Sequence, residues 1–172
     1  MRNLILISTI IFLYGTLPSF SQTDLTKNEG LEWHTDAIKA QELSKNSHKP
    51  IFAFFTGSDW CGWCHKLQND VFSKPEFIAW AKKNVILLEL DFPKRKQLAP
   101  ELAQQNASLQ QTFQVRGYPT IWLYYSIKDK TENKFNITAL GTLAYPAGAE
   151  VGKEEQLFIS NANKLLTKDK GN

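Results

Sequence analysis

The chain has 172 residues, of which 42% are hydrophobic and 22% are charged, a composition typical of one ordinary globular domain with its own core. Its 20 Lys and Arg residues against 17 Asp and Glu residues give a net charge of +3, which is too balanced for a protein that binds nucleic acid through charge. The presence of only two cysteines excludes a small scaffold held together by several disulfides.

Residues 1–21 have the layout of a secretory signal peptide. Arg2 precedes a short, mainly apolar stretch from Leu4 to Leu17, and Ser19 and Ser21 place small residues at the two positions that determine cleavage. The stretch is shorter than a membrane span needs, although an uncleaved anchor is the alternative. We therefore expect cleavage after Ser21 and a periplasmic or secreted protein, in an oxidising compartment.

Two helices and a buried strand are predicted in the next part of the chain. Residues 22–30 are polar and predict a flexible segment, and Leu31–Asn46 has a helical pattern with Trp33 on its apolar side. The continuous apolar run Pro50–Thr56 is typical of a central strand buried on both faces. A second helix is expected from Cys61 to Phe72.

The middle of the chain continues the alternation of helices and strands. The segment Ser73-Lys74-Pro75-Glu76 is typical of a capping box with proline in the first turn, and it predicts a short helix that ends at Lys83. An apolar strand is predicted at Val85–Leu90. A third helix is indicated by four apolar residues that share one face: Leu98, Leu102, Leu109 and Phe113.

The last third predicts a hairpin and a final helix. Strands are expected at Thr120–Ile127 and Phe135–Leu143, joined by a polar turn at Lys128–Lys134. The final helix is expected at Glu150–Leu166, with three residues facing inward: Phe158, Ala162 and Leu165. This order of elements, without a repeat or a linker, predicts one α/β domain over residues 31–168 with a mixed sheet.

The segment Trp60-Cys61-Gly62-Trp63-Cys64-His65 lies directly between the predicted buried strand and a helix. A cysteine at the first turn of a helix faces unpaired backbone N–H groups and the positive end of the helix dipole, which stabilise a thiolate. We therefore expect a lowered pKa for the Cys61 thiol and an exposed, nucleophilic sulfur. Cys64 shares a helix face with Leu67 and Val71, so its sulfur should be sheltered.

One activated and one sheltered sulfur indicate a dithiol/disulfide switch. Cys61 would attack a substrate disulfide, and Cys64 would then resolve the mixed disulfide. The internal bond closes too short a loop to be a major structural staple.

Three other interpretations of the cysteine pair remain open. Cys61-Gly62-Trp63-Cys64-His65 also matches the attachment pattern of c-type haem, although the only Met is Met1 and the other histidines are His34 and His48. A zinc site would need two further ligands, and the chain has no second cysteine pair. The disulfide could also be inert, in a binding module that uses Trp60 and Trp63 as contact residues.

Two segments of this chain resemble the thioredoxin superfamily. Phe54–Lys66 looks like the active-site strand, turn and helix, most of all in exported single-domain members, and Val115–Thr120 is similar to the Gly-x-Pro-Thr element before a later strand. The resemblance implies a thioredoxin-like fold, with a mixed sheet of four to five strands flanked by helices. It also implies that Pro119 is cis and that the Tyr118 backbone pairs with an extended substrate.

The chain departs from thioredoxin itself at two places. Gly62-Trp63 replaces Gly-Pro between the cysteines, and an ungapped match puts Phe55 where thioredoxin has a buried Asp. That loss removes the usual internal proton acceptor. Glu89 and Asp91 are candidate substitutes, although a solvated structural role is the preferred interpretation for both.

We therefore expect an exported thiol–disulfide oxidoreductase, with reductase favoured over oxidase or isomerase because no extra dimerisation domain is visible. Trp60 would shield the disulfide and Trp63 would present an apolar surface to unfolded substrates. The basic turn Lys94-Arg95-Lys96 is interpreted as solvated rather than as a docking site. No organic cofactor is expected. The expected partners are exported proteins or peptides with disulfides and a redox partner dithiol protein, which could be membrane-bound; nucleic acid is not expected.

Overall fold

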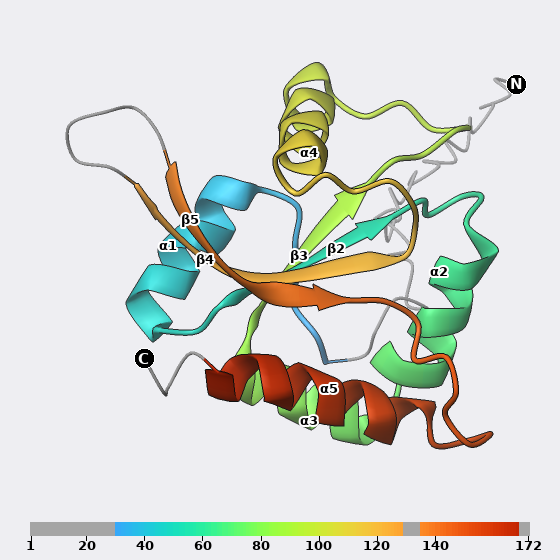
Figure 1. Ribbon diagram of the computed structural model, residues 1–172. Coiled ribbons are helices and arrows are strands. Elements are labelled where there is room, and N and C mark those ends of the chain that lie inside the picture. Colours follow the sequence, from blue (N-terminus) through green and yellow to red (C-terminus); the bar gives the residue numbers. More distant parts are fainter. Residues whose placement is uncertain (1–29, 129–134, 169–172) are drawn as a thin grey trace, which may run out of the picture.

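The structure is a computed structural model that describes residues 30–128 and 135–168 (Figure 1). The predicted signal peptide of residues 1–21, residues 22–29 of the predicted flexible segment and most of the predicted turn at Lys128–Lys134 lie outside the described residues. In the described part of the chain, no helix has the length and apolar character needed to cross a membrane.

A mixed sheet of five strands forms the centre of the domain, in the order β1-β3-β2-β4-β5. The strands are β1 (Trp33–His34), β2 (Ile51–Thr56), β3 (Ile86–Asp91), β4 (Thr120–Lys128) and β5 (Phe135–Leu143). The first three strands run parallel to one another, whereas β4 is antiparallel to β2 and to β5. The predicted α/β class and mixed sheet are confirmed.

Helices cover both faces of this sheet, as Figure 1 shows. They are α1 (Ala37–Ser47), α2 (Gly62–Leu67), the π-helix η1 (Gln68–Phe72), α3 (Pro75–Asn84), α4 (Pro100–Thr112) and α5 (Glu154–Lys168). Two hydrophobic clusters result. The first, between the sheet and the α2, α3 and α5 side, contains Phe52 and Phe54, and the second, on the α1 and α4 side, contains Ala53 and Phe55. The central strand β2 is therefore buried on both faces, as its sequence predicts.

The first helix begins later than predicted, because Trp33 and His34 belong to the sheet. They pair in parallel with Leu87 and Leu88 of β3 as a two-residue edge strand. The helix then begins after Asp36, whose carboxylate accepts the N–H groups of Ile38 and Lys39 at 2.8 and 3.2 Å. The final helix also begins later than predicted, at Glu154 rather than Glu150.

The predicted capping box before α3 is wrong. Lys74 is the capping position and makes no side-chain hydrogen bond there, while the Ser73 hydroxyl donates to the Asn69 carbonyl at 2.8 Å. One free N–H of the first turn, that of Phe77, instead donates to the Glu155 carboxylate of α5 at 2.7 Å. The start of α3 is therefore stabilised from a distant helix.

Candidate active site

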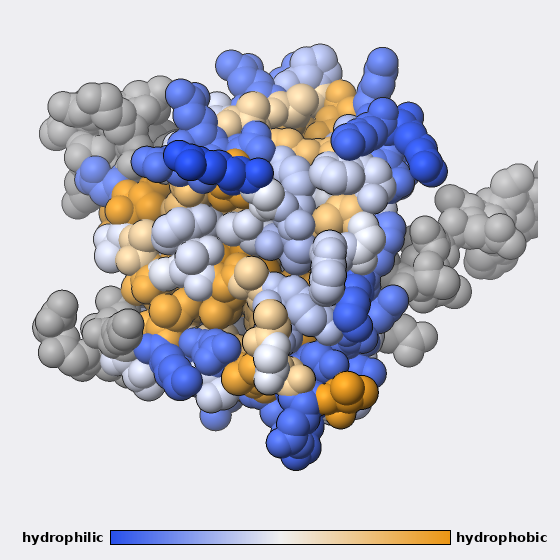
Figure 2. All heavy atoms as spheres, turned by 45° about the vertical axis from the view of Figure 1, so that its right-hand side comes forward, coloured by the Kyte–Doolittle hydropathy of each residue, from blue (hydrophilic) through white to orange (hydrophobic). Residues whose placement is uncertain are grey.

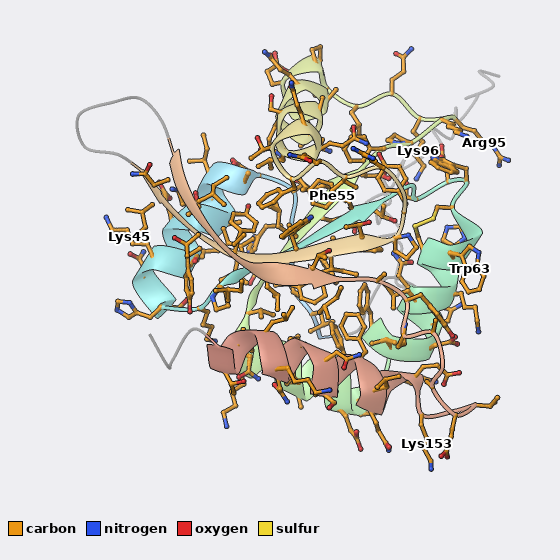
Figure 3. All side chains as sticks on the ribbon, viewed as in Figure 1. Lys45, Phe55, Trp63, Arg95, Lys96 and Lys153 are labelled. Carbon is orange, nitrogen blue, oxygen red and sulfur yellow. A yellow bond between two sulfur atoms is a disulfide. The ribbon has the colours of Figure 1, made fainter. Side chains whose placement is uncertain are left out.

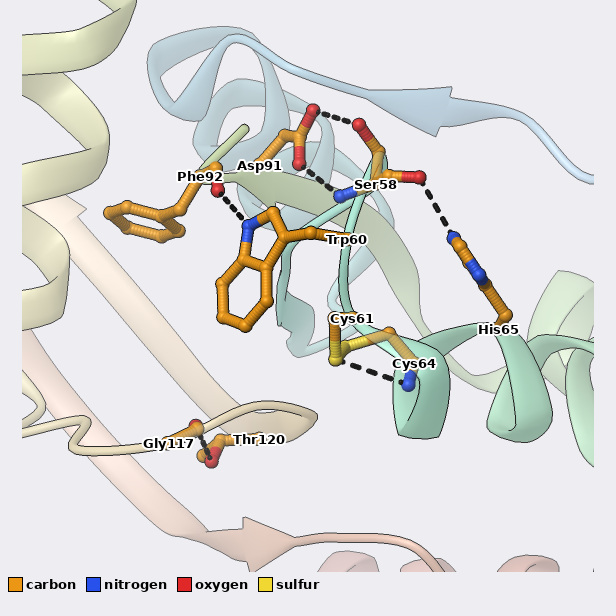
Figure 4. Close-up of a disulfide and its surroundings, with 9 residues drawn as sticks. All are labelled: Ser58, Trp60, Cys61, Cys64, His65, Asp91, Phe92, Gly117 and Thr120. Carbon is orange, nitrogen blue, oxygen red and sulfur yellow. Dashed lines mark hydrogen bonds between the residues drawn. A yellow bond between two sulfur atoms is a disulfide. The ribbon is translucent and has the colours of Figure 1, made fainter. Parts of the chain in front are cut away.

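The two cysteines form a disulfide at the start of α2. The chain leaves β2 in a tight turn, in which the Cys61 N–H donates to the Gly57 carbonyl at 2.9 Å, and Cys61 then caps the helix in an extended conformation. The sulfur atoms of Cys61 and Cys64 are bonded, with 5.2 Å between their Cα atoms (Figure 4). This geometry brings together the pair that the sequence singled out.

The two sulfur-bearing residues differ in burial and in hydrogen bonding. Cys64 is fully buried, whereas Cys61 retains an exposed fraction of 5%, so the expectation of a freely exposed nucleophile is wrong in degree. The backbone N–H of Cys64 points at the Cys61 sulfur at 3.2 Å. A donor in this position stabilises negative charge on sulfur, so the arrangement favours Cys61 as the thiolate.

The Trp60 indole lies against the turn that precedes Cys61. Its Nε1 donates to the Phe92 carbonyl at 2.8 Å, and the Lys94 ammonium lies 3.9 Å from the ring centroid. A Cβ atom on Gly57 would lie 2.5 Å from the indole, so glycine is needed there for close approach. These contacts fix Trp60 between the disulfide turn and the loop after β3.

The Asp59 carboxylate binds the backbone of the loop that follows β3. Asp59 accepts the backbone N–H groups of Lys94, Arg95 and Lys96, at 2.9, 2.7 and 3.2 Å. The hydrogen bond from Lys94 is the main cause of a pKa for Asp59 below its usual value. Sequence reasoning did not single out Asp59, because its partners lie 35 to 37 residues away.

The two candidate proton acceptors have different surroundings. Asp91 accepts the Ser58 N–H at 2.7 Å and the Ser58 hydroxyl at 2.6 Å, which ties the end of β3 to the disulfide turn. Glu89 is buried, so the preferred interpretation of it as solvated is wrong. Phe55, at the position where thioredoxin has a buried Asp, has an apolar ring that stacks on Phe92. Phe55 belongs to the hydrophobic cluster on one face of the sheet, whereas Cys64 belongs to the cluster on the other face.

The loop before β4 lies on the same side of the molecule as the disulfide, as the positions of Gly117 and Thr120 in Figure 4 show. The Tyr118–Pro119 peptide bond is cis, the geometry that the resemblance implies. The Tyr118 ring contacts Trp60 edge to face at 5.8 Å and stacks on Phe92 at 5.2 Å. Burial, and secondarily the charge of Asp91, raises the pKa of Tyr118. The Tyr118 side chain is therefore uncharged at neutral pH.

Trp63 is 60% exposed and contacts a residue that sequence reasoning missed. Its ring lies edge to face with Tyr145, at 5.3 Å between centroids. The Tyr145 hydroxyl donates to Asp70 at 2.7 Å, and Lys66 binds the same carboxylate at 2.6 Å, which is the main cause of the lowered pKa of Asp70. Tyr145 lies in the segment between β5 and α5, where no local sequence pattern marks it.

His65 is turned away from the sulfur atoms. Its Nε2 lies 2.8 Å from the Ser58 carbonyl, to which it donates in the matching tautomer. A c-type haem site instead uses the two sulfurs for thioether bonds and the histidine as iron ligand. Here the sulfurs are bonded to each other, and the imidazole is engaged with the backbone.

A mixed sheet of five strands, a Cys-x-x-Cys disulfide at a helix start and a cis-proline loop beside it together define a thioredoxin-like protein. The chain belongs to the thioredoxin-like domain family, whose model matches residues 38–129. The fold class predicted from the sequence is thereby confirmed.

Similar proteins include two from Chlamydia pneumoniae. The disulfide bond reductase DsbH is 38% identical over 103 residues, which are 60% of this chain and 61% of that protein. The thioredoxin-related protein DsbJ is 25% identical over 166 residues, 96% of this chain and 45% of that protein. The chain therefore matches about three fifths of the length of DsbH and less than half of the length of DsbJ.

Two solved structures extend the comparison. A structure of the DsbH oxidoreductase has a TM-score of 0.64 and 28% identity, and the match covers 88% of this chain and 95% of that one. A thioredoxin from Thermus thermophilus has a TM-score of 0.55 and 14% identity over 81% of this chain and 89% of that one, a likeness of fold alone.

Proposed function

We propose that the protein is an exported thiol–disulfide oxidoreductase that acts as a reductase, with Cys61 as the nucleophile and Cys64 as the resolving thiol. The observation that carries the proposal is the asymmetry of the pair: Cys61 keeps the exposed fraction and receives the Cys64 N–H, while Cys64 is fully buried. The relative DsbH is named a disulfide bond reductase, which favours the direction toward reduction.

The reaction proceeds by two exchanges of sulfur partners. The Cys61 thiolate attacks one sulfur of a substrate disulfide, the substrate S–S bond breaks, and the departing substrate thiolate takes up a proton. Cys64 then loses its proton and attacks the Cys61 sulfur of the mixed disulfide. The Cys61–Cys64 bond forms, the second substrate thiol leaves, and two electrons have passed from the protein to the substrate.

The proposed substrate-binding residues come from the disulfide motif and from the loop before β4. Trp60 and Tyr118 are in contact with each other beside the cis bond of Pro119. We infer that the Tyr118 backbone pairs with an extended segment of the substrate, as the resemblance implies. Trp63, between the two cysteines, offers an exposed ring.

The oxidised protein needs a source of electrons to act again. A dithiol partner protein supplies them by the reverse exchange, in which its two thiols become a disulfide and the Cys61–Cys64 bond is reduced. The predicted signal peptide at residues 1–21 and the cysteine usage support a site of action in a periplasm or outside the cell, where a donor linked to the membrane would serve this role.

An insulin-reduction assay with single cysteine variants tests the proposal. We expect Cys61→Ser to abolish turnover, because no nucleophile remains, and Cys64→Ser to accumulate a mixed disulfide visible on a non-reducing gel. A glutathione redox titration of the wild-type protein gives the potential of the pair. Turnover by the Cys61→Ser variant would contradict the assigned roles, and a wild-type protein without turnover would indicate a non-catalytic binding module.

A further inference from the structure

The loop between β3 and α4 carries Lys94, Arg95 and Lys96 next to Trp60, one of the proposed substrate-binding residues. We propose that these three residues, the basic loop, are a docking surface that selects substrates whose reacting cysteine is flanked by acidic residues. The inference rests on the proposed function and names the class of polypeptide that the same site prefers. It revises the interpretation of this turn as merely solvated.

One carboxylate fixes the basic loop without neutralising its side chains. Asp59 binds only the backbone N–H groups of Lys94, Arg95 and Lys96. All three basic residues are exposed. Figure 3 shows Arg95 and Lys96 at the same end of the molecule as Trp63, with Lys45 at the opposite end. The backbone is thereby held in place while the cationic groups remain available to a partner.

The basic loop contacts the proposed substrate-binding residues directly, through Trp60. The Lys94 ammonium lies over one part of the indole, 3.9 Å from its centroid, and the same indole contacts Tyr118. The carbonyl of Phe92, two residues before Lys94, accepts the indole N–H. A substrate segment that contacts Trp60 and Tyr118 therefore lies next to the cationic groups.

The two nearby carboxylates already have hydrogen-bond partners. Asp59 is occupied by the backbone of the basic loop, and Asp91 by Ser58. Among residues 30–128 and 135–168, no carboxylate forms an ion pair with Arg95 or Lys96. Figure 2 shows strongly hydrophilic side chains along the upper right of the face that it presents. The basic loop therefore carries three exposed cationic side chains against the one carboxylate, Asp59, that binds its backbone.

A local positive field acts on the encounter with a charged substrate. It speeds the association of oppositely charged partners by factors of about 10 to 1,000, and salt weakens it because the Debye length is only ~8 Å at physiological ionic strength. The net charge of the chain is only +3, so the preference should depend on the basic loop rather than on the overall charge.

Three peptides that differ only in charge test this preference. Each has one cysteine flanked by Glu, Gln or Lys on both sides and is supplied as its disulfide-linked dimer. The reduced protein is mixed with each dimer, and the rate of peptide release is divided by the rate with dithiothreitol, which corrects for the different reactivity of each disulfide. At low salt, we expect the corrected rate for the Glu peptide to be about tenfold that for the Lys peptide, with the Gln peptide between them. The difference in corrected rate should shrink at high salt.

Charge variants locate the effect. The double variant Arg95→Glu, Lys96→Glu should reverse the Glu-to-Lys ratio, and Arg95→Gln, Lys96→Gln should reduce it toward one. The double variant Lys39→Glu, Lys45→Glu, at two exposed lysines on α1, changes the net charge by the same amount and should keep the wild-type ratio. A ratio is compared because a change in Cys61 reactivity affects all peptides equally. Circular dichroism checks that each variant folds. If the double Glu variant does not fold, the ratio measured with the double Gln variant tests the proposal.

The outcomes separate this inference from the function on which it depends. Equal corrected rates for the three peptides, or a ratio that both double variants leave unchanged, would overturn the docking surface while the reductase assignment stands. Failure of the wild-type protein to reduce any peptide would overturn the reductase function and the docking surface together.

Discussion

Trp60 and Trp63 belong to one short motif, yet their surroundings give them different tasks. Trp60 is fixed by its hydrogen bond to Phe92 and by the Lys94 ammonium over its ring. Trp63 is mostly exposed and is contacted by Tyr145 on one edge. Large exposed apolar rings next to a reactive group are suited to binding apolar segments of a partner.

Replacing Trp63 by Ala should therefore weaken substrate binding without unfolding the domain. Loss of about 1–2 kcal/mol of contact energy corresponds to a rise in the KM for insulin of about 5- to 30-fold, with a smaller change in kcat. Steady-state kinetics and a thermal melt measure the two effects. Ile38→Ala is the control, because Ile38 is 58% exposed on α1, outside the proposed site, and its loss should leave KM unchanged.

Sequence motifs pointed to candidate residues more readily than to the residues that contact them. Cys61, Cys64 and Pro119 follow from short motifs, because their chemistry depends on local spacing. Asp59 and Tyr145 could not be found in this way, since each acts on a segment far away in the chain. Such long-range contacts leave no periodic or spacing signal.

At the scale of elements, the misplaced boundaries have identifiable causes. A two-residue strand such as Trp33–His34 is too short for any alternation to be visible, and its pairing with β3 decides its conformation. The helix expected over Cys61–Phe72 contains the π-helical segment Gln68–Phe72. Val71 and Phe72 of this segment are both fully buried, and no sequence pattern distinguishes its π-helical turn from a regular α-helix. The Ser73 hydroxyl donates back to that segment, and the capping position of α3 falls on Lys74 instead.

The contact between β5 and α5 gives a prediction about elements. Gly141 has a positive φ of 152°, and an added Cβ would lie 2.6 Å from a Leu165 methyl group. Gly141→Ala should therefore lower the free energy of unfolding by about 1–3 kcal/mol, because the helix must shift or the leucine must change rotamer. Urea denaturation measures this loss.

A double-mutant cycle shows whether that loss comes from the helix contact. Leu165→Ala removes the clashing methyl groups, so the pair of substitutions should cost less than the sum of the two single ones. Additive costs would place the effect in the backbone conformation of Gly141 rather than in the packing of α5.

At the scale of the whole molecule, the domain extends beyond the part that matches the family model. That match ends at residue 129, whereas α5 contributes the buried residues Phe158 and Ala162 to the core cluster around Phe72 and Phe77. The same helix caps α3 through Glu155. The core on this face of the sheet is therefore incomplete without the C-terminal helix.

A chain that ends at residue 143 should accordingly lose its cooperative thermal transition, since the removed helix leaves aromatic rings of the core exposed to water. A chain of residues 30–172 should keep the transition, because it retains both hydrophobic clusters. Circular dichroism melts of the two chains compare them directly. A sharp transition in the chain ending at 143 would show that the predicted domain over residues 31–168 is larger than the folding unit.

The fold as a whole was more predictable than its details. The apolar run of β2 and the alternation of helices and strands predict a mixed sheet, because these patterns follow from burial on one or both faces. The position of β1 at the edge of the sheet, next to β3, is set by tertiary pairing, which the sequence pattern alone does not specify.

The small accessible fraction of Cys61 also limits which disulfides the proposed reductase could attack. With only 5% of this residue accessible, the attacking atom cannot approach a disulfide enclosed within a compact fold. The target bond must arrive on a narrow stretch of chain, such as a protruding loop or a polypeptide that has not yet folded. Such a reductase would leave the buried disulfides of folded proteins intact and would act on disulfides that are still accessible to solvent.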